Sequence, residues 1–229
     1  MPDSSRELLR QYVRLTEFLG RALGPDYEVA LHDLTDTNRS LIAIANGQIS
    51  GRKVGAPLTN RALSILRDKS YEHSDYRIHD YGLSVSGKEL RSNTMFIKDG
   101  DRLIGMLCIN FDDGRYRAAA EEILGLCHPD AFLASAMSSA LPEVAPAYLA
   151  PETFSHSPEA LVRDAAGREL ERRGVTAERL TTDERAEIIT ALDESGIFLI
   201  KGAVKDVAAA LGCSQASVYR YLARRKGET

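Results

Sequence analysis

The sequence predicts an α+β protein with two domains: an N-terminal antiparallel sheet with helices and a C-terminal all-α helical domain. Strand-like segments recur between residues 27 and 111, flanked by helical patterns. Beyond residue 157, apolar residues recur at helical spacing only. The stretch between is rich in Pro, Ala and Ser, a composition typical of a connector. We therefore expect domains at residues 1–127 and 158–229, joined by a linker at 128–157.

Composition and charge limit the class of protein. The 229 residues are 44% hydrophobic, enough for at least one sizeable core, and carry a net charge of −4. No run of apolar residues is long enough for a transmembrane helix, and the charged, amphipathic N-terminus does not resemble a secretory signal. Cys108, Cys127 and Cys213 are far apart in apolar surroundings, which favours reduced thiols. These features predict a cytoplasmic protein without membrane association.

The N-terminal domain is expected to begin with a helix, because apolar residues recur at helical spacing up to Leu23, where Gly24-Pro25 ends the pattern. Residues 27–31 and 40–45 then read as a hairpin around a turn rich in Asp, Thr and Asn. A second helix is expected after Pro57.

Three further strands are expected at residues 81–86, 91–97 and 103–111, and Asp99-Gly100 is a hairpin signal between the last two. The strand at 103–111 is the most apolar and is expected to be central. The polar residues 71–80 are expected to be irregular.

Helix signals divide the C-terminal domain. Ser157 and Pro158 suit the N-cap and first position of a helix that Gly174 ends. Thr181 and Glu184 form a capping box that opens the next helix.

Two short helical patterns then meet at Gly212 within residues 204–225, with Ser214 suited to the N-cap of the second. Small Ala208 and apolar Val218 and Tyr221 stand at the spacing of a helix-turn-helix.

Once Val218 and Tyr221 are buried, polar and basic side chains remain for the outer face of the second helix, where base edges and phosphates would be met. Residues 200–229 carry six basic and two acidic side chains, a net charge of +4, so residues 1–199 hold −8. The alternative is a helical hairpin that binds no nucleic acid. The residues expected to contact DNA are Ser214, Gln215, Ser217, Tyr219, Arg220, Arg224 and Arg225.

Candidate ligand-binding residues lie in the N-terminal domain. Arg52 lies in a loop between two glycines, and its guanidinium suits a carboxylate; the alternative is a solvent-exposed loop arginine. His32 could line a pocket or be a turn histidine bonded to local backbone. Ser92 and Thr94 share one strand face, which lines a polar cavity or faces solvent. Asn110 either faces the same pocket or caps its strand.

The sequence contains no persuasive metal-ligand spacing and no catalytic constellation. No distinctive haem histidine or flavin-binding cysteine loop is evident. We therefore expect no metal, no cofactor and no enzymatic activity. Cys108 is expected to be a core residue rather than a reactive thiol.

Several stretches resemble a known family. Residues 28–34 (EVALHDL), 44–47 (IANG), 51–55 (GRKVG) and 103–112 (LIGMLCINFD) make residues 15–111 similar to the YheO-like PAS domain. Residues 180–222, ending in SVYRYL, resemble the helix-turn-helix paired with it. The resemblance implies a bacterial transcriptional regulator without catalysis, within a family that includes the group named for D-arginine utilisation repression. It leaves the effector, the operator and the regulatory sign open.

The expected function is therefore that of a transcriptional regulator. A PAS-like domain would sense a small-molecule effector, amino-acid-like by resemblance, and control binding of double-stranded DNA. A homodimer is expected, because one short recognition helix reads few base pairs and a two-fold operator doubles the contacts. The alternative is a signalling adaptor whose helix-turn-helix binds protein.

Overall fold

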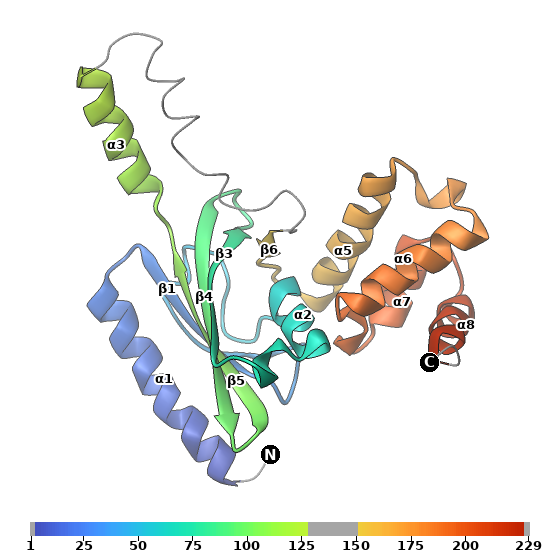
Figure 1. Cartoon of the computed structure of the whole chain (residues 1–229), viewed down its shortest axis with the longest axis horizontal. Helices are drawn as coiled ribbons and strands as arrows, with labels where there is room; N and C mark the ends of the chain where they lie inside the picture. The colour runs from blue at the N-terminus through green and yellow to red at the C-terminus, as the bar shows by residue number, and fades with distance from the viewer. Residues whose placement is uncertain (1–2, 128–150, 227–229) are drawn as a thin grey trace.

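The structure is a computed structural model that describes residues 3–127 and 151–226 (Figure 1). The N-terminal part contains α1 (Asp3–Leu23), β1 (Tyr27–Asp33), β2 (Leu41–Ala45), α2 (Asn60–Asp68), η1 (Ser70–Glu72), β3 (Tyr76–Leu83), β4 (Glu89–Asp99), β5 (Arg102–Phe111) and α3 (Gly114–Cys127). The C-terminal part contains β6 (Glu152–Thr153), α5 (Pro158–Arg173), η2 (Ala177–Arg179), α6 (Thr182–Glu194), η3 (Ile197–Leu199), α7 (Ala203–Ala210) and α8 (Gln215–Lys226). The predicted α+β fold class is confirmed.

One six-stranded sheet organises the N-terminal part, with the strand order β2-β1-β5-β4-β3-β6. Neighbouring strands are antiparallel except β3 and β6, which run parallel. The predicted hairpins β1–β2 and β4–β5 are confirmed, and the apolar strand β5 is internal, as its composition indicated.

Two strand predictions need correction. β3 begins at Tyr76, inside the stretch expected to be irregular, because its polar residues pair with β4 around a bulge at which His79 has a φ of 63°. Residues 152–153, placed in the expected linker, form β6 at the edge of the sheet. The rest of that linker up to residue 150 lies outside the described residues.

Helix α1 covers one face of the sheet (Figure 1). The leucines and Tyr12 of its apolar stripe pack on Val29, Leu31 and Leu107. Gly20 allows this close approach, since a Cβ there would lie 2.2 Å from the Cβ of Ala45.

The opposite face packs against α2 and the C-terminal helices, and both parts share one hydrophobic core. Figure 1 shows α2 between the sheet and α5 and α6. Asn38 exchanges two hydrogen bonds with the backbone of Lys201, and Arg67 pairs with Asp193 at 2.5 Å. The connection between the two parts is therefore a packed junction.

The predicted helix signals of the C-terminal part are confirmed. Ser157 accepts a hydrogen bond from the backbone N–H of Ala160, Gly174 ends α5 with a φ of 64°, and Thr181 and Glu184 form both bonds of the capping box. Within the described ranges, no helix is both long and apolar enough to cross a membrane.

Candidate functional site

The sheet face that packs against α2 carries an unusual set of polar side chains, all buried. Strand register aligns the residues of this face in rows across β1, β5 and β4: Glu28, Asn110 and Ser92 in one row, and Cys108 and Thr94 beside the apolar Ala30 in the next. Their residue exposures run from 0 to 7%. His32 lies one row further on, beside Met106 and Phe96. Side chains two residues apart on a strand point to the same face, so these groups form one surface.

The first row is a continuous hydrogen-bond network. Ser92 Oγ donates to Asn110 Oδ1 at 2.6 Å, and Asn110 Nδ2 donates to Glu28 Oε1 at 2.8 Å. The backbone N–H and the hydroxyl of Ser50 donate to Glu28 Oε2. Burial raises the pKa of Glu28, while the bonds from Ser50 and Asn110 and the charge of Arg52 act in the opposite direction.

Arg52 is buried, with 3% of the residue exposed, so the alternative of a solvent-exposed loop arginine is wrong. Its Nη2 donates to the carbonyl oxygen of Pro57, and within the described ranges its Nε has no hydrogen-bond partner. Burial lowers the pKa of Arg52, while the charges of Glu28, Cys108 and Glu152 act to raise it. A buried guanidinium with an unused donor is suited to hold an anion.

The polar side chains of the second and third rows, those of Thr94, Cys108 and His32, are also buried. Thr94 Oγ1 lies 3.6 Å from Cys108 Sγ, and burial raises the pKa of this thiol to about 12, so Cys108 is an inert core residue. His32 Nδ1 lies 2.9 Å from Ser40 Oγ within the protein interior. The pKa of His32 lies well below 6.5, because burial lowers it and the charge of Arg52 lowers it further by a smaller amount.

The depressed pKa of His32 predicts a pH dependence of stability. Below pH 6.5 the unfolded chain binds a proton at this histidine and the folded chain does not, so unfolding becomes easier as the pH falls. Relative to a His32→Gln variant, the wild type should lose about 1.4 kcal/mol of unfolding free energy per pH unit below that value. Urea unfolding of both proteins across this range measures the difference, and the raised pKa of Glu28 cancels in the comparison. Parallel pH profiles would contradict the assignment.

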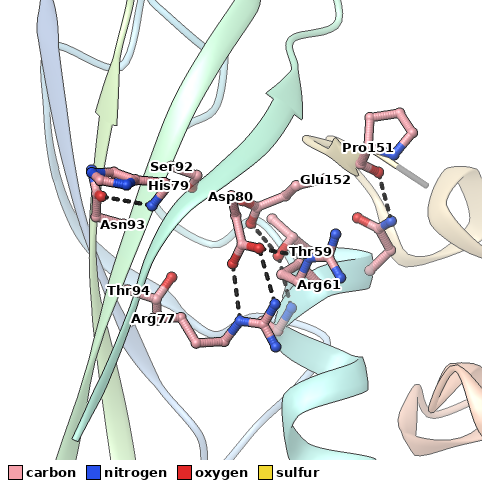
Figure 2. A network of polar contacts seen from close by, with 12 residues as sticks. Thr59, Arg61, Arg77, His79, Asp80, Ser92, Asn93, Thr94, Pro151 and Glu152 are labelled. Carbon is pink, nitrogen blue, oxygen red and sulfur yellow. Dashed lines mark hydrogen bonds and ion pairs between the residues drawn. The ribbon is translucent and has the colours of Figure 1, made fainter. Parts of the chain in front are cut away.

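A second polar network joins the sheet edge to α2 (Figure 2). Asp80 on β3 pairs with Arg77 at 3.0 Å and lies 3.8 Å from Arg61 Nε on α2. Glu152 on β6 accepts a hydrogen bond of 2.7 Å from Thr59, the N-cap of α2.

The structure thus brings together the five ligand-site residues predicted from sequence, namely His32, Arg52, Ser92, Thr94 and Asn110. Ser92 and Thr94 are buried, so the interpretation of their strand face as solvent-exposed is wrong, as is that of His32 as a turn residue. Sequence reasoning missed Glu28 and Glu152. Glu28 carried a signal, since it is a charged residue in phase with Ala30 and His32 on an apolar strand. Ligand binding by these groups stays a prediction.

The helix-turn-helix geometry follows the predicted pattern. Gly212 has a φ of 60°, and Ser214 Oγ accepts a bond from the backbone N–H of Ser217 at 3.1 Å. Val218 and Ala208 are buried between α7 and the neighbouring helices. α7 and α8 lie at the opposite end of the molecule from α1 (Figure 1).

The outer surface of α8 is polar and basic. Gln215, Tyr219, Arg220 and Arg224 are exposed, and Arg220 lies over the ring of Tyr221 at 5.5 Å from its centroid. Ser217 is half-buried, with its hydroxyl 3.0 Å from that of Ser214. The side chain of Arg225 lies outside the described part of the structure.

Comparison with known families agrees with this architecture. Residues 3–128 match the family model of the YheO-like PAS domain, and residues 161–223 match that of an HTH domain. The chain therefore belongs to the YheO-like PAS domain family. The pairing of a PAS domain with a helix-turn-helix domain supports a DNA-binding regulator.

Several relatives match this chain along most of their length. The chain is 31% identical to YheO of Escherichia coli K12 over 96% of this chain and 85% of the relative. It is 29% identical to a protein of Haemophilus influenzae, over 99% and 95% of the two chains. It is 27% identical to the transcriptional regulator DauR of Pseudomonas aeruginosa PAO1, over 99% and 98%.

Proposed function

We propose that the protein is a cytoplasmic transcriptional regulator whose PAS domain binds a small metabolite and thereby controls binding of α8 to an operator. The observation that carries the proposal is the shared core, which joins a sheet face with buried charged groups to the helix-turn-helix. A ligand bound to the sheet face more tightly in one arrangement of this core would shift the equilibrium toward that arrangement. The regulator would have no catalytic activity of its own.

The metabolite would be anionic or zwitterionic. Arg52 supplies a buried guanidinium with an unused Nε, which would bind a carboxylate. The hydroxyls of Ser92 and Thr94, with His32 and Asn110, would orient the rest of the molecule. The similarity to DauR, a transcriptional regulator, supports a regulator of the same kind.

A homodimer would place two copies of α8 on a two-fold operator. Its contact surfaces would include the outward sides of α1 and α3, which carry exposed apolar side chains. These are Val13, Phe18, Tyr116, Ile123 and Leu126. Leu126 is 82% exposed, and Figure 1 shows α3 extending away from the sheet.

Substitutions on α8 test the DNA-binding function. With a DNA site selected from random sequence by the wild type, Arg220→Ala should weaken binding by about 1–3 kcal/mol and relax the sequence preference, as loss of a bidentate base contact would. Arg224→Ala is the matched comparison, because a phosphate contact should weaken all sequences alike and lower the salt slope by about 1.

Fluorescence anisotropy at several salt concentrations separates these outcomes. If the wild type selects no DNA from random sequence, or if its affinity for DNA shows no salt dependence, the helix-turn-helix binds something other than DNA. The protein-binding adaptor then becomes the better account.

A further inference from the structure

Glu152 occupies an unusual position for a carboxylate. It opens β6, where it pairs with Gly82 of β3, and only 3% of the residue is exposed. Its Oε1 accepts the hydrogen bond from Thr59, but its Oε2 is buried and has no hydrogen-bond partner among the residues that the structure describes. Burying a carboxylate oxygen without a hydrogen bond costs free energy, so a bound molecule that donates to this oxygen would recover that cost.

Two opposite charges in this region each keep one unused polar atom. Arg52 has an Nε without a hydrogen-bond partner among the described residues, and its Nη2 donates to the carbonyl oxygen of Pro57. Thr59, which follows closely in the same segment, donates to Glu152, so Arg52 and Glu152 contact one short stretch of chain. No ion pair joins them among the described contacts. The chemical complement of such a pair is one small molecule that carries both an anionic group and a protonated amine.

Glu28, the other buried carboxylate of the face, is less suited to this role. Both of its oxygens are already engaged, one by Ser50 and the other by Asn110. Glu28 therefore holds the loop and strands in place, while one oxygen of Glu152 has no donor among the described residues.

Charge balance also favours a zwitterion. The carboxyl groups of Glu28, Asp80 and Glu152 lie in the same region as three guanidinium groups, those of Arg52, Arg61 and Arg77. Figure 2 shows Glu152, Asp80 and Arg61 together in one polar network. A molecule with no net charge leaves this balance unchanged, whereas a simple anion adds an unbalanced charge to a buried site.

We infer that Glu152 is a ligand-binding residue whose Oε2 receives the ammonium group of a zwitterionic effector held at its carboxylate by Arg52. This assignment rests on the proposed sensing function. It also gives the effector a direct contact with the segment that begins the DNA-binding part, because α5 has its N-cap at Ser157 and packs on α7.

The test is a thermal-shift measurement on the full chain with matched sets of three compounds. Each set contains an amino acid of either hand, the same molecule without its amine, and the same molecule without its carboxylate. At saturation, at least one amino acid should raise the melting temperature by about 5–10 °C, and its two partners should raise it far less. Glu152→Gln keeps the acceptor for Thr59 and should lose most of that shift, while Glu121→Gln on the exposed side of α3 should keep it.

Each other result overturns a defined part of the account. An equal shift from the molecule without its amine, or an undiminished shift in Glu152→Gln, overturns the role of Glu152 and leaves the anion site at Arg52 intact. No shift from any compound overturns the sensing function together with this inference. If Glu152→Gln does not fold, Glu152→Asp replaces it: a shorter carboxylate should weaken the shift from the amino acid, and an undiminished shift overturns the role of Glu152.

Discussion

Replacing Arg52 by alanine is expected to lower the free energy of unfolding by about 3 kcal/mol, the scale of removing one partner from a buried charged group. The substitution removes the bond to Pro57 and the positive charge that favours the ionised form of Glu28. It also leaves a void in a region where the residue is only 3% exposed.

The adjacent lysine is a matched control, because Lys53 is exposed on the same loop. Lys53→Ala should change stability by no more than about 0.5 kcal/mol, as is usual for a surface substitution. Urea denaturation of the two variants gives the comparison directly. Equal midpoints would mean that Arg52 contributes nothing from its buried position.

The second large effect is expected at the junction between the two parts. Gly196 has a φ of 80°, and a Cβ there would lie 2.6 Å from the carbonyl oxygen of Leu63 on α2. Gly196→Ala should therefore cost about 3 kcal/mol or more, since it combines an unfavourable backbone conformation with a clash against backbone.

Gly174 separates the two contributions. It has a φ of 64° at the end of α5, but a Cβ there would meet nothing within 4 Å. Gly174→Ala should cost only the conformational term, about 1–2 kcal/mol. If urea denaturation shows the same loss for both variants, α2 and the C-terminal helices are less tightly joined than the structure describes.

Local signals explain which parts of the fold could be predicted. Ser157, Gly174 and the capping box at Thr181 act through neighbouring backbone groups, so sequence alone locates the helix ends. β6 escaped prediction because a two-residue strand beside Pro151 has no periodicity, and its parallel partner β3 lies about seventy residues away in sequence.

The sequence was sufficient to name the residues of the candidate site but not to predict whether they are buried. Strand alternation placed Ser92 and Thr94 on one face, yet it could not say whether that face was covered. Burial follows from α2 and the C-terminal helices packing over it, which are contacts between segments distant in sequence. The same long-range packing buries Arg52, for which the sequence allowed either ligand contact or solvent exposure, and brings Glu152 beside Thr59.

The central claim is that occupation of the buried polar face changes DNA affinity through the shared core. The most direct measurement is an anisotropy titration of the selected DNA site, with and without the amino acid that gives the largest thermal shift. The account predicts that the amino acid changes the dissociation constant of the wild type by about 5- to 150-fold, and that Glu152→Gln shows little change. Identical titration curves for the wild type with and without a saturating amount of that compound would contradict it.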